Sequence, residues 1–113
     1  MPIAIKRVYE QPSDGDGRRI LVDRIWPRGV SKSTARIDDW LKEVAPSTEL
    51  RKWFGHDPER WTEFRRRYRA ELKDNEALAE LRTLAKKGKL TLVYAARDEQ
   101  HNQAVVLKEL LQK

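Results

Sequence analysis

Three stretches of the chain have the apolar character of β-strands. Residues 90–96 (LTLVYAA) are the best of these, and residues 20–22 (ILV) form a short apolar run bounded by charges. Such a continuous run is typical of a central strand buried on both faces. Residues 3–8 (IAIKRV) alternate weakly and are interpreted as a first strand. Between the strands predicted at 3–8 and 20–22, residues 11–17 (QPSDGDG) predict a loop or a wide hairpin connection.

The segment that follows the second strand has the end signals of short helices. Ser31 is a candidate N-cap for a helical turn that ends at Ala35. Ser47 is a candidate N-cap for a helix that ends at Phe54, just before a glycine. The residues between these helices, 37–44, fit either an irregular segment or a short helix.

Three longer helices are predicted in the second half of the chain. Asp57 followed by proline indicates the start of a helix, and the apolar residues after it recur at steps of three, four and four, on one helical face: Trp61, Phe64, Tyr68 and Leu72. Asn75 is the candidate cap of the next helix, which ends at residues 86–88 (KKG). Asp98 is the candidate cap of the last one.

Strands separated by long helical segments need crossover connections, so they favour at least partly parallel pairing. We therefore predict an α/β fold with a three- or four-stranded sheet covered by helices. The first two strands could pair in either direction. The length of 113 residues fits a single domain over residues 1–113, and the sequence has no internal repeat or linker.

The amino-acid composition excludes several kinds of site and limits the classes of partner. The chain has no cysteine, which excludes disulfides, thiolate nucleophiles and cysteine-containing zinc sites. It has no apolar run near the ~20 residues of a membrane span and no signal-peptide pattern, so we expect a cytoplasmic protein without membrane association. The net charge of +6 fits anionic partners or an arginine-rich solvated surface. The basic residues are interleaved with acids, which favours the second interpretation.

Ligands of open α/β sheets bind beyond the carboxyl ends of the strands. This rule selects residues 23–29 and 94–102, and both segments are rich in ligand-binding groups. We predict a pocket for a small anionic molecule bearing a phosphate or carboxylate, because arginine suits planar recognition of both groups. The candidate ligand-binding residues are Arg24, Trp26, Arg28, Arg97, His101 and Asn102. Candidates for a catalytic role are His101, His56 and Asp23.

Each of these residues also has a structural interpretation. Asp23 could pair with an arginine and fix its own loop, and Asp98 could simply cap a helix.

No metal site is predicted, because the two histidines lack the spacing of common metal motifs. No cofactor is predicted either, since the chain has no glycine-rich phosphate loop. The serines lack the strand–serine–helix elbow of hydrolases.

Four motifs resemble the YeaO-like branch of domain of unknown function 488 (DUF488). They are LVDRIWPRG at 21–29, WLKEVAPS at 40–47, LRKWFGHDP at 50–58 and DEQHNQA at 98–104. The resemblance covers nearly the whole chain and implies a compact α/β domain without a settled substrate or mechanism. Wider relatives carry a Cys–His pair near the start of the last helix. Residues 100–102 here read QHN, so thiol chemistry does not transfer.

The family's motif positions fall here on Asp23, Arg24, Trp26, Pro27, Arg28, Gly29, Pro46, Ser47, Trp53, Phe54, His56, Asp57, His101 and Asn102. The resemblance thereby adds His56, Asp57, Arg51 and Trp53 to the candidates from the middle of the chain. His56 could be a structural hydrogen-bonding group or could project into the pocket.

Two other functions remain open. The basic face at 65–69 could bind nucleic acid, although no nucleic-acid-binding signature accompanies it and Glu63–Arg67 and Arg67–Glu71 have the spacing of helical ion pairs. A non-catalytic interaction domain is the other alternative. It predicts an exposed apolar patch and no well-formed pocket between the two strand-end segments. The oligomeric state and any reaction stay undetermined at this level.

Overall fold

The computed structural model describes residues 3–112 and has an α/β fold built on one parallel sheet. The four strands lie in the order β1-β4-β2-β3, and each pair is parallel. Their bounds are Ile3–Arg7 (β1), Arg18–Leu21 (β2), Asp39–Trp40 (β3) and Leu90–Tyr94 (β4). The predicted fold class and all three predicted strands are therefore confirmed.

Two details of the sheet differ from the sequence-based expectation. β1 and β2 do not pair in either direction, because β4 lies between them, so the connection between them is a crossover and not a hairpin. A fourth strand, β3, lies inside the segment 37–44 that was expected to be irregular or helical. β3 is only two residues long. It pairs with Ile20 and Leu21 along the edge of β2 that faces away from β4.

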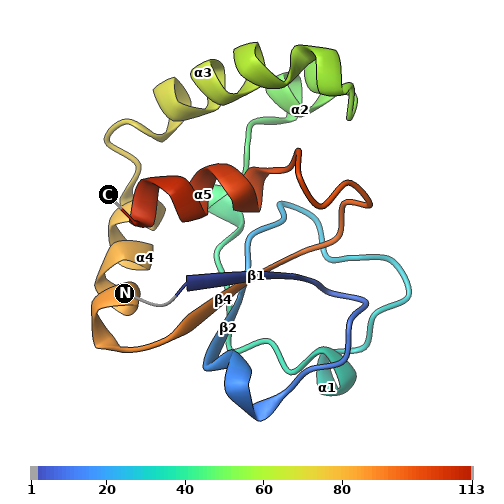
Figure 1. Cartoon of the computed structure of the whole chain (residues 1–113), viewed down its shortest axis with the longest axis vertical. Helices are drawn as coiled ribbons and strands as arrows, with labels where there is room; N and C mark the ends of the chain where they lie inside the picture. Colours follow the sequence, from blue (N-terminus) through green and yellow to red (C-terminus); the bar gives the residue numbers. More distant parts are fainter. Residues whose placement is uncertain (1–2, 113) are drawn as a thin grey trace.

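The alternation of β2 sends its apolar side chains to both faces of the sheet. Ile20 and Val22 join the larger core, which includes residues of the four helices after β3. Leu21 faces the other way, into a smaller cluster with Val8, Ala35 and Val93. In Figure 1 the helices α2, α3 and α5 accordingly lie to one side of the strands and α1 to the other. β2 is thus buried on both faces, as its continuous apolar run predicts.

The helices largely follow the predicted boundaries. They are Lys32–Ala35 (α1), Thr48–Phe54 (α2), Trp61–Leu72 (α3), Glu76–Lys87 (α4) and Gln103–Leu111 (α5), with 3-10 turns at Asp14–Asp16 (η1), Lys42–Val44 (η2) and Pro58–Arg60 (η3). The predicted N-caps Ser31, Ser47 and Asn75 each accept a backbone hydrogen bond in the first turn. Asp57 caps η3, and α3 continues from that turn.

The predicted cap of the last helix is wrong. α5 begins four residues later than expected, and its N-cap is Asn102, whose side chain accepts a hydrogen bond from the Val105 amide at 3.2 Å. Asp98 instead closes a turn by accepting hydrogen bonds from the amides of Gln100 and His101. Both residues are good cap formers, so the sequence pattern alone could not choose between them.

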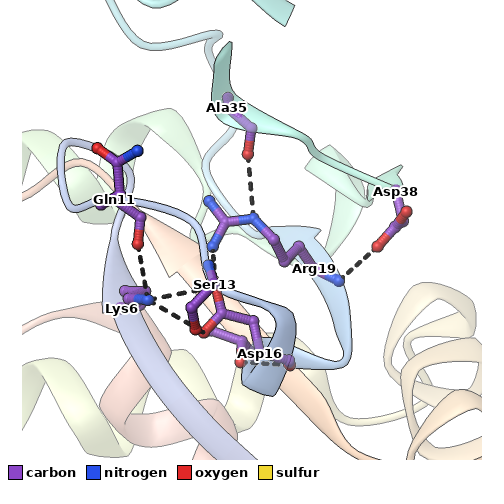
Figure 2. Close-up of polar contacts among 8 residues, drawn as sticks. Lys6, Gln11, Ser13, Asp16, Arg19, Ala35 and Asp38 are labelled. Carbon is purple, nitrogen blue, oxygen red and sulfur yellow. Dashed lines mark hydrogen bonds and ion pairs between the residues drawn. The ribbon is translucent and has the colours of Figure 1, made fainter. Parts of the chain in front are cut away.

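A buried ionic network fixes the start of β2 (Figure 2). The Asp16 carboxylate accepts hydrogen bonds from Lys6 Nζ at 3.0 Å, from Arg19 Nη1 at 2.7 Å and from Ser13. Burial raises the pKa of Asp16, but the hydrogen bonds from the Ser13 amide, Lys6, the Ser13 hydroxyl and Arg19 outweigh it, so this pKa lies well below its usual range. Arg19 Nε also donates to the Ala35 carbonyl, which connects β2 to α1.

No helix within residues 3–112 combines the length and apolar character needed to cross a membrane.

Candidate functional site

A pocket of about 760 Å³ opens at the carboxyl ends of β2 and β4. The loop after β2 and the loop after β4 both line it, together with the end of α2. Because the sheet is parallel, these loops emerge at the same edge, as the strand-end rule predicts. The candidate ligand-binding residues and the three candidates for a catalytic role all line this pocket: Asp23, Arg24, Trp26, Arg28, His56, Arg97, His101 and Asn102.

Asp23 holds the two loops together at this pocket. Its carboxylate accepts hydrogen bonds from the Ala95 amide at 3.0 Å and from Gln103 Nε2. Burial raises the pKa of Asp23 to about 6, although these two hydrogen bonds and the charge of Arg51 act in the opposite direction. No arginine of residues 3–112 forms an ion pair with Asp23, so the structural pairing considered from the sequence does not occur.

Three of the candidate ligand-binding residues already have structural partners. Arg24 donates to the carbonyls of Pro46 and Ala45, at 3.2 and 3.0 Å, so it anchors its loop to the segment before α2. Trp26 Nε1 donates to the Val30 carbonyl at 2.7 Å. The Asn102 side chain caps α5 and also donates to the Asp98 carbonyl at 2.9 Å. These side chains shape the pocket wall, and their main polar groups are largely occupied.

Three other arginines of the pocket are without such partners. Within residues 3–112, the side chains of Arg28, Arg51 and Arg97 form no hydrogen bond and no ion pair. Arg28 and Arg97 are exposed, and Arg51 is half-buried at the pocket wall. With Arg24, four arginines line the pocket against two carboxylates, Asp23 and Asp98. The pocket therefore carries an excess of positive charge that an anion could neutralise.

His101 is held in a defined orientation at the pocket. Its Nδ1 lies 2.8 Å from Asp98 Oδ2, and its ring meets Trp61 edge-on at 5.2 Å between centroids. Hydrogen bonds from the Gln100 amide, the His101 side chain and the His101 amide lower the pKa of Asp98, so its carboxylate is ionised at neutral pH. The proton of a neutral imidazole therefore lies on Nδ1, which leaves Nε2 as a hydrogen-bond acceptor.

His56 follows the left-handed residue Gly55 and itself has a positive φ of 57°. Its exposed ring packs beside Phe54 at 6.2 Å between centroids and makes no side-chain hydrogen bond within residues 3–112. His56 is among the residues that line the pocket, and its role there stays a prediction. Asp57 and Trp53 lie elsewhere: Asp57 caps η3, and Trp53 packs against Arg60 and Arg67.

The basic face of α3 is partly neutralised, because two glutamates pair with its four arginines. Arg65 and Arg69 both pair with Glu109 of α5, at 2.8 and 3.5 Å. Arg66 and Arg67 both pair with Glu63, at 2.6 and 2.8 Å. The Glu63–Arg67 pair agrees with its spacing, whereas Glu71 instead accepts hydrogen bonds from Ser47.

Within the part of the chain that the structure describes, no group of three or more His, Cys, Asp or Glu side chains is arranged to hold a metal ion. The polar groups that remain for a ligand at the pocket are guanidinium groups and imidazole rings. This set of donors suits an anionic organic molecule better than a cation.

Comparison with known proteins places the chain in a family. The family model described as the inactive DUF488-N3 subclade matches residues 2–113. The chain belongs to the DUF488 family. An uncharacterised protein of Mycobacterium tuberculosis is 50% identical over 109 residues, covering 96% of this chain and 92% of that protein. The uncharacterised protein YeaO of Escherichia coli is 46% identical over 112 residues, covering 98% and 97%. No solved structure gives a significant match.

Gln103, which bonds Asp23 in this DUF488 domain, was not predicted from the sequence. The two residues are eighty positions apart, and only the meeting of the two loops brings them together. Arg51 was considered through the family motifs alone, since α2 lies far from either strand end in the sequence. Its place at the pocket depends on how α2 packs over the sheet.

Proposed function

We propose that this DUF488 domain binds a small organic anion, bearing a carboxylate or phosphate, in the pocket at the carboxyl edge of the sheet. The observation that carries the proposal is that three arginines around one pocket, Arg28, Arg51 and Arg97, have no polar side-chain partner among residues 3–112. Guanidinium groups in a concave site bind carboxylate and phosphate through paired hydrogen bonds. A volume of about 760 Å³ lies in the range of small-molecule sites.

We further propose that this binding occurs without catalysis. The subclade to which the chain belongs is described as inactive, and the chain has no cysteine to act as a nucleophile. The polar atoms of Arg24, Trp26 and Asn102 serve the architecture of the pocket. The arrangement supports recognition more directly than bond making.

A thermal-shift screen with carboxylated and phosphorylated metabolites tests the proposal. A ligand at 100 times its dissociation constant should stabilise the fold by about 2.7 kcal/mol. Arg28→Gln, Arg51→Gln and Arg97→Gln should each weaken binding by about tenfold or more, because each removes one charged donor. Arg82→Gln is the matched control, since Arg82 is an exposed arginine of α4 that does not line the pocket.

The proposal fails if no anion of the screen stabilises the protein. It also fails if the stabilisation is the same in the three pocket variants and in Arg82→Gln, because binding would then depend on net charge alone. A second possible function, nucleic-acid binding by α3, is not favoured because the four arginines at 65–69 are paired with Glu63 and Glu109.

A further inference from the structure

The pocket is lined by apolar side chains as well as by arginines. Besides the arginines, the lining includes apolar side chains from four stretches of the chain: Ile25, Trp26, Pro27, Pro46, Phe54 and Ala96. Ile25 is 61% exposed although it is a large aliphatic residue. It lines the pocket and does not belong to either core cluster of the described residues. A simple inorganic anion would leave this apolar surface without a partner.

The aromatic members of the wall are held rigidly. Trp26 packs edge-on against Trp40 at 5.5 Å, and its indole N–H is bonded to Val30. Phe54 is stacked on Phe64 at 4.2 Å, with only 21° between the ring planes. Aromatic side chains that are already held in place favour a flat ring over a flexible chain, because neither partner loses much conformational freedom on binding.

His101 adds a requirement for a hydrogen-bond donor on the ligand. Its Nδ1 is occupied by Asp98, and its Nε2 has no partner among residues 3–112. Nε2 of this tautomer accepts a hydrogen bond, so it matches a hydroxyl or an N–H group and not a second anionic oxygen.

From this mixed lining and the orientation of His101, we propose that the ligand is a ring-bearing anion: a carboxylate or phosphate attached to a flat aromatic ring that also carries a hydroxyl or N–H donor. This inference rests on the proposed anion-binding function and names its ligand class. The anionic group pairs with Arg28, Arg51 and Arg97. The ring lies against the Ile25 and Trp26 wall, and the donor bonds to His101 Nε2.

Calorimetric titrations with matched probes test each part. Acetate, benzoate and the three hydroxybenzoate isomers form the carboxylate series, and inorganic phosphate and phenyl phosphate form the phosphate series. The ring-bearing probes should bind about tenfold more tightly than acetate or inorganic phosphate, because they bury apolar surface as well as charge. At least one hydroxybenzoate isomer should bind several-fold more tightly than benzoate, and its methoxy analogue, which cannot donate, should lose that gain.

Two variants separate the contributions. Ile25→Ser should reduce the affinity for the ring-bearing probes several-fold and leave acetate and inorganic phosphate unchanged. Ile25 is exposed and outside the core, so this variant should fold normally. His101→Phe keeps a ring against Trp61 and should abolish only the advantage of the hydroxyl. Nitrogen-15 spectra of the wild-type imidazoles give an independent measurement, because hydrogen bonding to Nε2 of His101 should shift that signal.

The outcomes distinguish this inference from the function on which it rests. If no probe binds, both proposals are overturned. If anions bind through the arginines but ring-bearing and simple probes have equal affinity, only the ligand class is wrong. An unshifted His101 Nε2 signal, or equal binding of the hydroxybenzoates and their methoxy analogues, removes the role of His101.

Discussion

Single residues of the same type have different roles in this pocket. Arg24 and Arg28 lie four positions apart in one loop, yet Arg24 is held by two carbonyls and Arg28 makes no side-chain hydrogen bond among the described residues. The difference arises because the segment before α2 passes beside Arg24, and that contact joins positions more than twenty residues apart. A sequence pattern can place both arginines at a strand end, but it cannot show which one is already occupied.

The carboxyl group of Asp23 leads to a prediction at this scale. Because its folded-state pKa of about 6 lies above the value of about 3.9 in an unfolded chain, its contribution to stability is full below pH 4. That contribution is lost as the pH rises through about 6, where the buried group must ionise. The Asp23→Asn variant has no carboxyl group to ionise at this position, so it does not lose stability in this way as the pH rises. The stability of the variant relative to the wild type should therefore increase by about 2 kcal/mol between pH 4 and pH 7.

Urea unfolding of both proteins at several pH values provides the measurement, and the difference between them cancels the titration of the other groups. Asp14→Asn serves as the control, because Asp14 is exposed and makes no side-chain hydrogen bond among the described residues. If the free energies of unfolding of Asp23→Asn and the wild type differ by the same amount at every pH, the pKa of Asp23 is not raised in the folded protein.

At the scale of elements, the predictable features are those encoded by neighbouring residues. Ser31, Ser47 and Asn75 were identified as caps because the cap and the first turn are contiguous. β3 could not be identified, because Asp39 and Trp40 have no strand pattern of their own and pair only with the edge that β2 supplies. The order of the strands was equally hidden, since β4 enters between β1 and β2 from the far end of the sequence.

The close approach of β2 and β4 gives the prediction at this scale. Gly17 precedes β2 with a φ of 66° and ψ of −143°, a conformation that side-chain-bearing residues rarely adopt. A Cβ at this position would lie 2.5 Å from the Lys89 carbonyl oxygen, which is backbone and accepts the hydrogen bond of the Arg18 amide. Gly17→Ala should therefore destabilise the fold by at least about 2 kcal/mol.

Thermal or chemical unfolding of Gly17→Ala measures this cost. Gly15→Ala is the matched control two residues away, because a Cβ at Gly15 would meet only the Ser13 hydroxyl at 4.0 Å. The control should change stability by less than about 1 kcal/mol. Equal effects of the two substitutions would mean that the contact between Gly17 and Lys89 does not constrain the start of β2.

The molecule as a whole carries a formal charge of +6, and how that charge is distributed matters more than its sum. On α3, Glu63 and Glu109 each pair with two arginines. Two of the four positive charges on this face are thereby offset, which lowers the number of phosphate groups that α3 could neutralise. At the pocket, by contrast, Arg28, Arg51 and Arg97 have no pair to break within the described residues. This distribution is the reason for proposing one small anion, and not a polyanion, as the partner.

This distribution predicts little affinity for nucleic acid. In fluorescence anisotropy titrations with labelled single strands and duplexes of about twenty nucleotides, the wild type should show no saturable binding at 150 mM salt with protein up to ~100 μM, where general nucleic-acid-binding proteins already bind. The double variant Glu63→Gln and Glu109→Gln frees four arginines and should acquire binding at low salt that falls steeply as salt is added. Wild-type binding with that same steep dependence, unchanged in the double variant, would contradict the pairing argument, because the two glutamates would then make no difference to binding.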